Sequence, residues 1–229
     1  MKEQLQKDFD NIIKNLSLSQ RDTEIKQFYL DNFINKGFPN RRDENWKFSD
    51  LNQIIKKNIG ELSFYNDYTS TNKVDTSLFV DGLEHNKIVF INGRIEKIDF
   101  DYERKDQIEI IDKSETINRF NNNNSLSDLN NAFTNKSFKI IVKNGYQLVK
   151  PLIIYHITNS DIWSKNINLR LDFELGKDSS LRLIDLFNDT SEKNFLNIFY
   201  NFDLKENAVL KNYKVDKHEN KNIKYFFNN

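Results

Sequence analysis

A stretch near the end of the chain repeats an earlier one at a spacing of 29 residues. Asn168–Lys177 (NLRLDFELGK) aligns with Asn197–Glu206 (NIFYNFDLKE), which places Phe173 over Phe202. The same spacing relates two further sets of residues: Leu152, Leu181 and Leu210, and Ile140, Leu169 and Ile198. A unit of this length with two short strands is typical of a parallel β-helix or solenoid, in which each turn stacks on the last. Because an antiparallel sandwich gives no reason for a fixed spacing, the repeat predicts a right-handed parallel β-helix.

The period of the apolar residues divides the chain into three parts. Residues 1–60 show the helical period, and we expect a helical N-terminal region there. Residues 61–86 contain only isolated apolar side chains, and we predict an irregular connector. Residues 87–229 show the period of two that is typical of strands, and we predict that they form the β-helix core. The expected fold class is therefore mainly β with a helical N-terminus (α+β).

Three helices are expected in the first part of the chain. The apolar stripe of the first helix consists of Leu5, Phe9, Ile12, Ile13 and Leu16. Ser19 is predicted to be the N-cap of the second helix, and Gly37 is predicted to end it. A third short helix is expected from about Ser49 to Gly60.

Two local signals stand out in the β region. The dipeptide Asn92-Gly93 lies between two alternating segments and predicts a hairpin turn. A helical pattern interrupts the strands over residues 126–133, and Ser125 or Ser127 is available as its N-cap.

Composition excludes several classes of protein. The 34 basic and 34 acidic residues cancel, which argues against a strongly cationic nucleic-acid binder. Cysteine is absent, so the chain has no disulfide, no thiolate nucleophile and no cysteine ligand for zinc or an iron–sulfur cluster. Neither a signal peptide nor an apolar stretch of 18 residues is present. We expect a soluble cytoplasmic protein that binds neither nucleic acid nor membrane.

The sequence contains no recognisable catalytic motif. Its six glycines are widely separated, which excludes a P-loop and a dinucleotide-binding glycine pattern. His85, His156 and His218 lack a second histidine at the spacing of a metal site, and His156 is expected to be a hydrogen-bonded partner on a strand. We therefore predict no catalytic, cofactor-binding or metal-ligating residues, and a protein that is not an enzyme.

Paired carboxylates leave one alternative open, because many parallel β-helices cleave polysaccharides with acidic residues on one face. Asp172, Glu174 and Asp185 are expected on strands, and Asp172 and Glu174 are two residues apart and can share a face. One repeat later, Asn201 and Asp203 replace them, as expected of a solvated outer face. The alternative function is a carbohydrate-active or carbohydrate-binding β-helix protein.

The most specific motif is Gly37–Leu51, which reads GFPNRRDENWKFSDL. From the residues alone, acidic Asp43 and Glu44 beside two arginines indicate a salt-bridged linker that Trp46 anchors to the core. The segment closely resembles the N-terminal signature of the SufB/SufD family, and the SufD-type members most of all. The matching positions are Gly37, Pro39, Arg41, Arg42, Glu44, Trp46, Lys47, Phe48, Ser49 and Leu51.

Further family-like segments follow in order along the chain. Val89–Gly93 (VFING) is similar to a family strand that ends in Asn-Gly. Leu129–Phe133 (LNNAF) and Gly145–His156 (GYQLVKPLIIYH) resemble two later family segments. The resemblance covers the whole chain, and it implies a helical N-terminal region that leads into a β-helix.

The resemblance also implies a function. SufD-type proteins are non-catalytic scaffold subunits of cytoplasmic iron–sulfur cluster assembly, and they pair with a SufB-like subunit and a SufC-like ABC-type ATPase. The cluster and ATP would belong to the whole complex, with no cofactor bound by this chain alone. Family members continue into more β-helix and a helical domain, and a β-helix that ended after Phe227 would have an open stacking face. We therefore expect a fragment, the alternative being a short form whose open face is capped by another chain. The expected role of the motif is structural, in joining the N-terminal helices to the β-helix.

Overall fold

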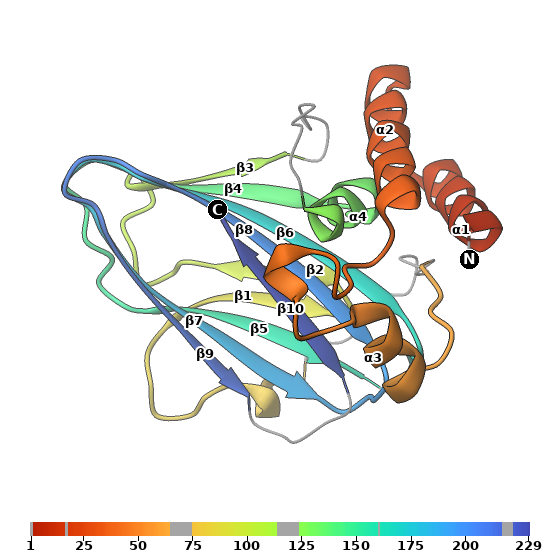
Figure 1. Cartoon of the computed structure of the whole chain (residues 1–229). Coiled ribbons are helices and arrows are strands. Elements are labelled where there is room, and N and C mark those ends of the chain that lie inside the picture. Colours follow the sequence, from red (N-terminus) through yellow and green to blue (C-terminus); the bar gives the residue numbers. More distant parts are fainter. Residues whose placement is uncertain (1, 17, 65–74, 114–123, 160, 217–221) are drawn as a thin grey trace.

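The computed structural model describes residues 2–16, 18–64, 75–113, 124–159, 161–216 and 222–229. It is an α+β protein in which N-terminal helices precede two mixed β-sheets (Figure 1). The helices are α1 (Lys2–Asn15), α2 (Gln20–Lys36), α3 (Leu51–Asn58) and α4 (Ser125–Phe133), with short 3-10 helices η1 (Glu44–Trp46) and η2 (Thr76–Leu78). The strands are β1 (Asn86–Ile91), β2 (Arg94–Asp99), β3 (Ile108–Asp112), β4 (Ser137–Val142), β5 (Leu152–Thr158), β6 (Asn166–Leu175), β7 (Ser180–Asp189), β8 (Phe195–Leu204), β9 (Val209–Asp216) and β10 (Ile223–Asn228).

The N-terminal helices follow their local sequence signals. The apolar stripe of α1 is buried at Leu5, Phe9 and Ile12. Ser19 caps α2, because its hydroxyl accepts a hydrogen bond from the Asp22 amide at 3.1 Å. Gly37 ends α2 with a φ of 72°, a conformation that costs glycine little. These three predictions are confirmed.

The predicted cap of α4 is wrong. Asn124 is the N-cap, and its side-chain oxygen accepts hydrogen bonds from the amides of Leu126 at 3.0 Å and Ser127 at 3.4 Å. Ser125 and Ser127 lie inside the helix, where both are buried. An asparagine is as good a cap as a serine, so the helix begins one residue earlier than Ser125 would allow and three residues earlier than Ser127 would allow.

Each sheet contains five strands, in the orders β2-β1-β5-β7-β9 and β10-β8-β6-β4-β3. From β4 onward, consecutive strands alternate between the two sheets, and neighbours within a sheet are parallel. The antiparallel pairs are β1 with β2 and β3 with β4. Asn92 and Gly93 join β1 to β2 with positive φ values of 50° and 85°, which confirms the predicted hairpin turn.

The predicted 29-residue register is confirmed for the later strands and wrong for the earlier ones. Phe173 pairs with Phe202 in β6 and β8, and Leu181 pairs with Leu210 in β7 and β9. Leu152, however, pairs with Leu183.

Ile140 also departs from the predicted register and pairs with Phe173. The reason is the length of the corners, the segments that connect a strand of one sheet to the next strand in the other sheet. Leu152 follows Val142 by ten residues, whereas Leu183 follows Leu175, at the equivalent position, by only eight. Two extra residues also separate Thr158 from Asn166, compared with Asp189 to Phe195.

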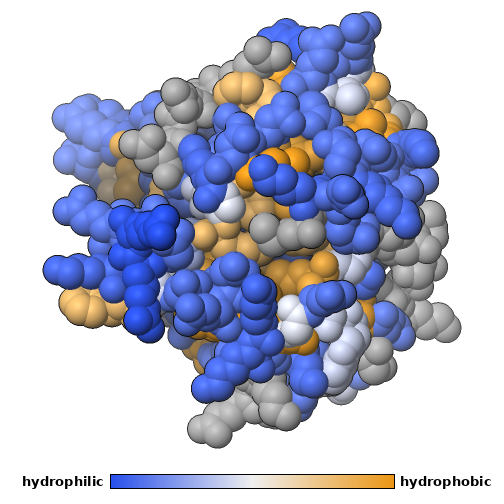
Figure 2. Space-filling model, turned by 45° about the vertical axis from the view of Figure 1, so that its right-hand side comes forward, coloured by the Kyte–Doolittle hydropathy of each residue, from blue (hydrophilic) through white to orange (hydrophobic). Residues whose placement is uncertain are grey.

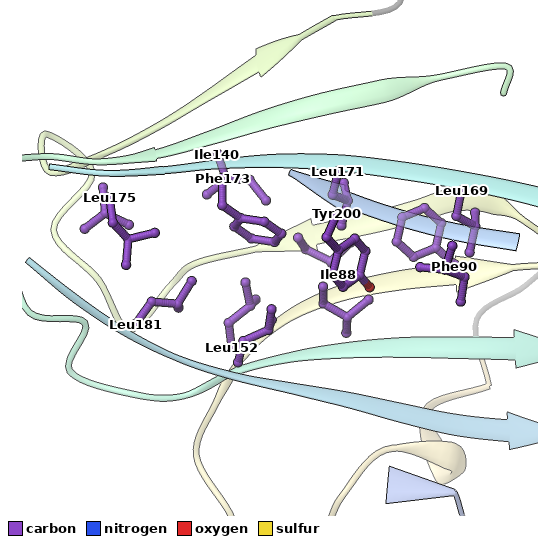
Figure 3. Packing of buried hydrophobic residues seen from close by; sticks show 14 of the residues in the cluster. Ile88, Phe90, Ile140, Leu152, Leu169, Leu171, Phe173, Leu175, Leu181 and Tyr200 are labelled. Carbon is purple, nitrogen blue, oxygen red and sulfur yellow. The ribbon is translucent and has the colours of Figure 1, made fainter. Parts of the chain in front are cut away.

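The main core lies between the two sheets, and Figure 3 shows Phe173 and Tyr200 reaching towards Ile88 and Leu152. A second core lies among the helices and the ends of β8 and β10, so the helices gather at one end of the sheets (Figure 1). A third, smaller cluster covers the outer face of β1 and β5. Among the helices of the described residues, none combines the length and apolar character needed to cross a bilayer.

Candidate functional site

The motif segment forms an ordered loop between α2 and α3. Phe38 is buried and packs edge-to-face against Phe33 and Phe195, with ring centroids 5.1 and 6.1 Å apart. The Pro39 carbonyl accepts a hydrogen bond from the Leu51 amide at 3.0 Å, which closes the loop at its base. Both ends of the motif are therefore attached to the helical core, and these attachments fix the position of the residues between them.

Hydrogen bonds within the loop fix its middle. The Asp43 carboxylate accepts a hydrogen bond from the Asn40 amide at 2.8 Å, and the Asn40 side chain accepts one from the Arg42 amide at 3.0 Å. The Trp46 amide then donates to the Asp43 carbonyl at 2.8 Å, which forms η1. These are the local turns that Asn and Asp favour.

The predicted salt-bridged linker is wrong. Within the described part of the chain, Arg41, Arg42 and Glu44 make no ion pair, and all three are exposed. The physical reason is that Asp43 uses its carboxylate for the loop backbone. Lys47 instead lies over the ring of Phe48, 5.9 Å from its centroid. The charged half of the motif therefore faces solvent.

Trp46 connects the motif loop to the last strand. Its ring lies 5.9 Å from that of Tyr225 on β10, and it packs against the helical core. Asn124, the cap of α4, donates to the Tyr225 hydroxyl at 3.0 Å. Burial raises the pKa of Tyr225, so its hydroxyl stays protonated at neutral pH. The predicted anchoring of Trp46 to the core agrees with this packing.

Strands β9 and β10 are the last strands of their sheets, and each is paired on one side only among the described residues. Val209 and Tyr213 of β9 are 49% and 55% exposed. Lys224 of β10 forms ion pairs with Asp189 of β7 at 2.9 Å and Asp216 of β9 at 2.5 Å. One end of the two sheets therefore combines backbone edges with apolar side chains.

A buried polar cluster lies inside the core. His156 of β5 is stacked between Phe90 and Phe187, and its Nε2 lies 2.9 Å from an Asp185 carboxylate oxygen. The Tyr200 hydroxyl donates to the same oxygen at 2.6 Å. Burial, together with the Asp185 charge, raises the pKa of Tyr200 well above its usual value. All three polar residues are fully buried, so this cluster is a structural network, and His156 is a bonded strand residue as predicted.

Of the other two histidines, the structure describes only His85. His85 is buried, with Nδ1 2.6 Å from the Leu83 carbonyl and Nε2 2.7 Å from the Tyr155 hydroxyl. Its contacts are therefore internal as well. His218 lies outside the described residues.

Of the three carboxylates considered for carbohydrate chemistry, Asp172 and Glu174 share the outward face of β6 as expected, but Asp185 does not join them. Asp185 points into the core, whereas Asp172 and Glu174 lie on β6 and are partly exposed. Glu174 pairs with Lys139, and Asp172 pairs with Arg170 at 3.4 Å. Each outward carboxylate is thus neutralised by a neighbouring cation.

Lys26 holds α2 against α4, a role that was not predicted from the sequence. Its ammonium group is buried and donates to the Thr134 carbonyl at 2.6 Å and to the Asn131 carbonyl at 3.3 Å, at the end of α4. Burial, followed by the charge of Arg170, lowers the pKa of Lys26 from 10.5 to about 7, although Asp22 acts in the opposite direction. A lysine on the apolar face of a helix is the signal that could have revealed it.

In the described part of the chain, no three histidine, aspartate or glutamate side chains group as a metal ion requires. No protein-family model matches this sequence, and no curated protein matches it significantly.

Proposed function

We propose that this protein is a SufD-like, non-catalytic scaffold subunit of a SufBCD-type iron–sulfur cluster assembly complex. The observation that carries the proposal is the Gly37–Leu51 motif, whose ten family-like positions fold into one ordered loop. This loop touches both the helical core and β10, as expected of a segment that joins two parts of a scaffold. The cluster is the cargo of the complex, and ATP binds to the ATPase partner in the cytoplasm.

We also propose that the two sheets are sides of a right-handed parallel β-helix. Repeated corner geometry supports this proposal, because Gly145, Asp178 and Asn207 all have positive φ at equivalent corners. The Gly145 amide donates to the Lys177 carbonyl at 2.7 Å, and the Asp178 amide donates to the Glu206 carbonyl at 2.9 Å. Successive corners therefore bond to each other, as stacked turns do.

The partner surface in this proposal is the end of the sheets at β9 and β10. An unpaired strand edge is a template for strand addition from another subunit. Because the Val209 amide donates towards β7, alternation along β9 directs the Lys214 amide towards the open edge. A SufB-like subunit is the partner that we expect at this edge, and a SufC-like ATPase completes the complex.

Co-expression of the full chain with the SufB-like and SufC-like proteins of its source organism tests the proposal. We expect all three to co-purify and to remain together in size-exclusion chromatography. Recovery of the chain without either partner would contradict the scaffold function.

A second comparison locates the contact. Lys214→Pro removes the outward amide donor of β9, whereas the matched Lys214→Ala removes only the side chain. Loss of the SufB-like partner from the proline variant alone supports pairing at this edge. If both variants retain the SufB-like partner equally, the contact lies elsewhere on the scaffold.

A further inference from the structure

A hollow of about 540 Å³ lies between α1, α3 and the segment that follows α3. Its floor is apolar and is formed by Phe38, Ile55, Leu62 and Phe64. The surface in Figure 2 likewise has a hollowed area of apolar side chains bordered by hydrophilic ones. The volume falls within the range of about 300–1,000 Å³ that is typical of small-molecule sites.

Buried polar contacts hold the floor in place. Asp8 of α1 is buried, and one of its carboxylate oxygens accepts a hydrogen bond from the Phe64 amide at 2.8 Å. The other oxygen accepts one from the side-chain amide of Gln4, which lines the hollow, also at 2.8 Å. This carboxylate joins the first helix to Phe64, so the hollow is formed before any ligand arrives.

Besides Gln4, the walls carry three polar side chains of different chemistry, namely Asn52, Lys56 and Glu61. In the described part of the chain, none of them makes a side-chain hydrogen bond or an ion pair. Lys56 and Glu61 do not pair with each other either, although both line the same hollow. A cation, an anion and an amide are therefore available above an apolar floor.

We propose that this hollow binds a zwitterionic ligand with an apolar body, of the size of a short hydrophobic peptide with free ends. The apolar side chains of the ligand would lie on Phe38, Ile55 and Phe64, where their burial drives binding. The ligand carboxylate would meet Lys56, and its ammonium group would meet Glu61. Asn52 can donate to or accept from the peptide group between them.

Isothermal titration calorimetry with the dipeptide Phe-Leu tests this site in the intact chain. We expect one-to-one binding to the wild-type protein. Acetylation of the dipeptide amine and amidation of its carboxylate should each weaken binding about fivefold, the scale of a partly exposed ion pair. An absence of binding at millimolar concentrations of the dipeptide would overturn the proposal.

Variants assign the two charges. Lys56→Gln should weaken binding of Phe-Leu about fivefold and leave binding of the amidated dipeptide unchanged. Glu61→Gln should likewise weaken binding of Phe-Leu about fivefold and leave binding of the acetylated dipeptide unchanged. Lys57→Gln is the matched control, because Lys57 is the next residue of α3 and does not line the hollow. Equal binding by the Lys56, Glu61 and Lys57 variants would overturn the site.

A floor variant distinguishes specific binding from general hydrophobic association. Leu62 lines the hollow and is half-buried, so Leu62→Trp fills part of the space without removing a core residue. We expect this variant to lose dipeptide binding while its melting temperature stays that of the wild type. Retained binding in a folded Leu62→Trp variant would show that the dipeptide binds elsewhere. None of these results depends on the proposed scaffold function, which is tested by co-purification.

Discussion

Asn130 of α4 donates hydrogen bonds to the backbone carbonyls of Leu169 and Asn197, at 3.0 and 2.8 Å. Asn197 in turn donates from its side chain to the Leu126 carbonyl of α4 at 2.8 Å. The two asparagines thus join helix and sheet in both directions, and both are buried. The attachment of α4 to the β-region therefore depends on polar contacts inside an otherwise apolar interface.

Asn197→Ala should lower the free energy of unfolding by about 2–3 kcal/mol, because it leaves buried hydrogen-bonding groups without partners. Urea unfolding followed by circular dichroism measures this change. Asn201→Ala is the matched control on the same strand, since among the described residues the Asn201 side chain bonds only to that of Asn229, at an exposed position. Similar losses in the two variants would contradict the role of the buried amide.

Trp46→Ala should lower the free energy of unfolding by about 2 kcal/mol, less than a fully buried tryptophan because the side chain is half-buried. The loss arises from its contact with Tyr225 and the helical core. Phe48→Ala, at a side chain that is 89% exposed, should change the free energy by less than about 0.5 kcal/mol. An unchanged urea midpoint for Trp46→Ala would refute a structural role for the motif.

The free energy of unfolding should increase as pH rises from 7 to 10, because the pKa of Lys26 is lowered in the folded state. In this window the unfolded chain binds a proton at Lys26 that the folded chain has lost, since the folded pKa is about 7. Stability therefore increases by up to about 1.4 kcal/mol per pH unit. Urea unfolding at pH 7.5 and 9.5 measures the increase, which Lys26→Met should abolish and the exposed Lys57→Met should retain. An equal change in the free energy of unfolding between pH 7.5 and 9.5 for the wild type and both variants would contradict the lowered pKa of Lys26.

Glu103 should contribute to stability above about pH 4.5 and lose that contribution in acid. Burial alone would raise the pKa of its carboxyl, but hydrogen bonds from the Lys150 amide and the Asn86 side chain outweigh burial, with further ones from Tyr146 and Val149, and lower it. The folded state then binds fewer protons than the unfolded state, so protonation as pH falls favours unfolding. The urea midpoint of Glu103→Gln should therefore fall less between pH 5.5 and 3.5 than that of the wild type. A larger fall in the variant would contradict this account.

Local signals predicted much of the fold. The two ends of α2 and the turn between β1 and β2 could be predicted because Ser19, Gly37 and Asn92-Gly93 act on their own neighbours along the chain. The cap of α4 was missed because adjacent Asn and Ser residues have nearly equal capping strength. The α+β class with N-terminal helices followed from the change of period.

Long-range relationships were harder to predict. Register in the earlier strands depends on corner length, and an alignment of strand residues does not contain that length. His156 contacts Asp185 at the predicted spacing of 29 residues, yet its register partner is Phe187, so the contact is diagonal and is not a pairing between opposite strand residues. The hollow beside α3 combines residues from four separate segments, and only Phe38 belongs to a motif.

The unequal corners have a practical consequence for engineering. The corner from Val142 to Leu152 holds two more residues than that from Leu175 to Leu183, yet the strands on both sides remain paired. Length added at a corner is therefore absorbed outside the sheets. Asp178 and Asn207, exposed at two such corners, are the positions where a peptide tag or a fluorophore could be inserted with least disturbance to the pairing of the strands.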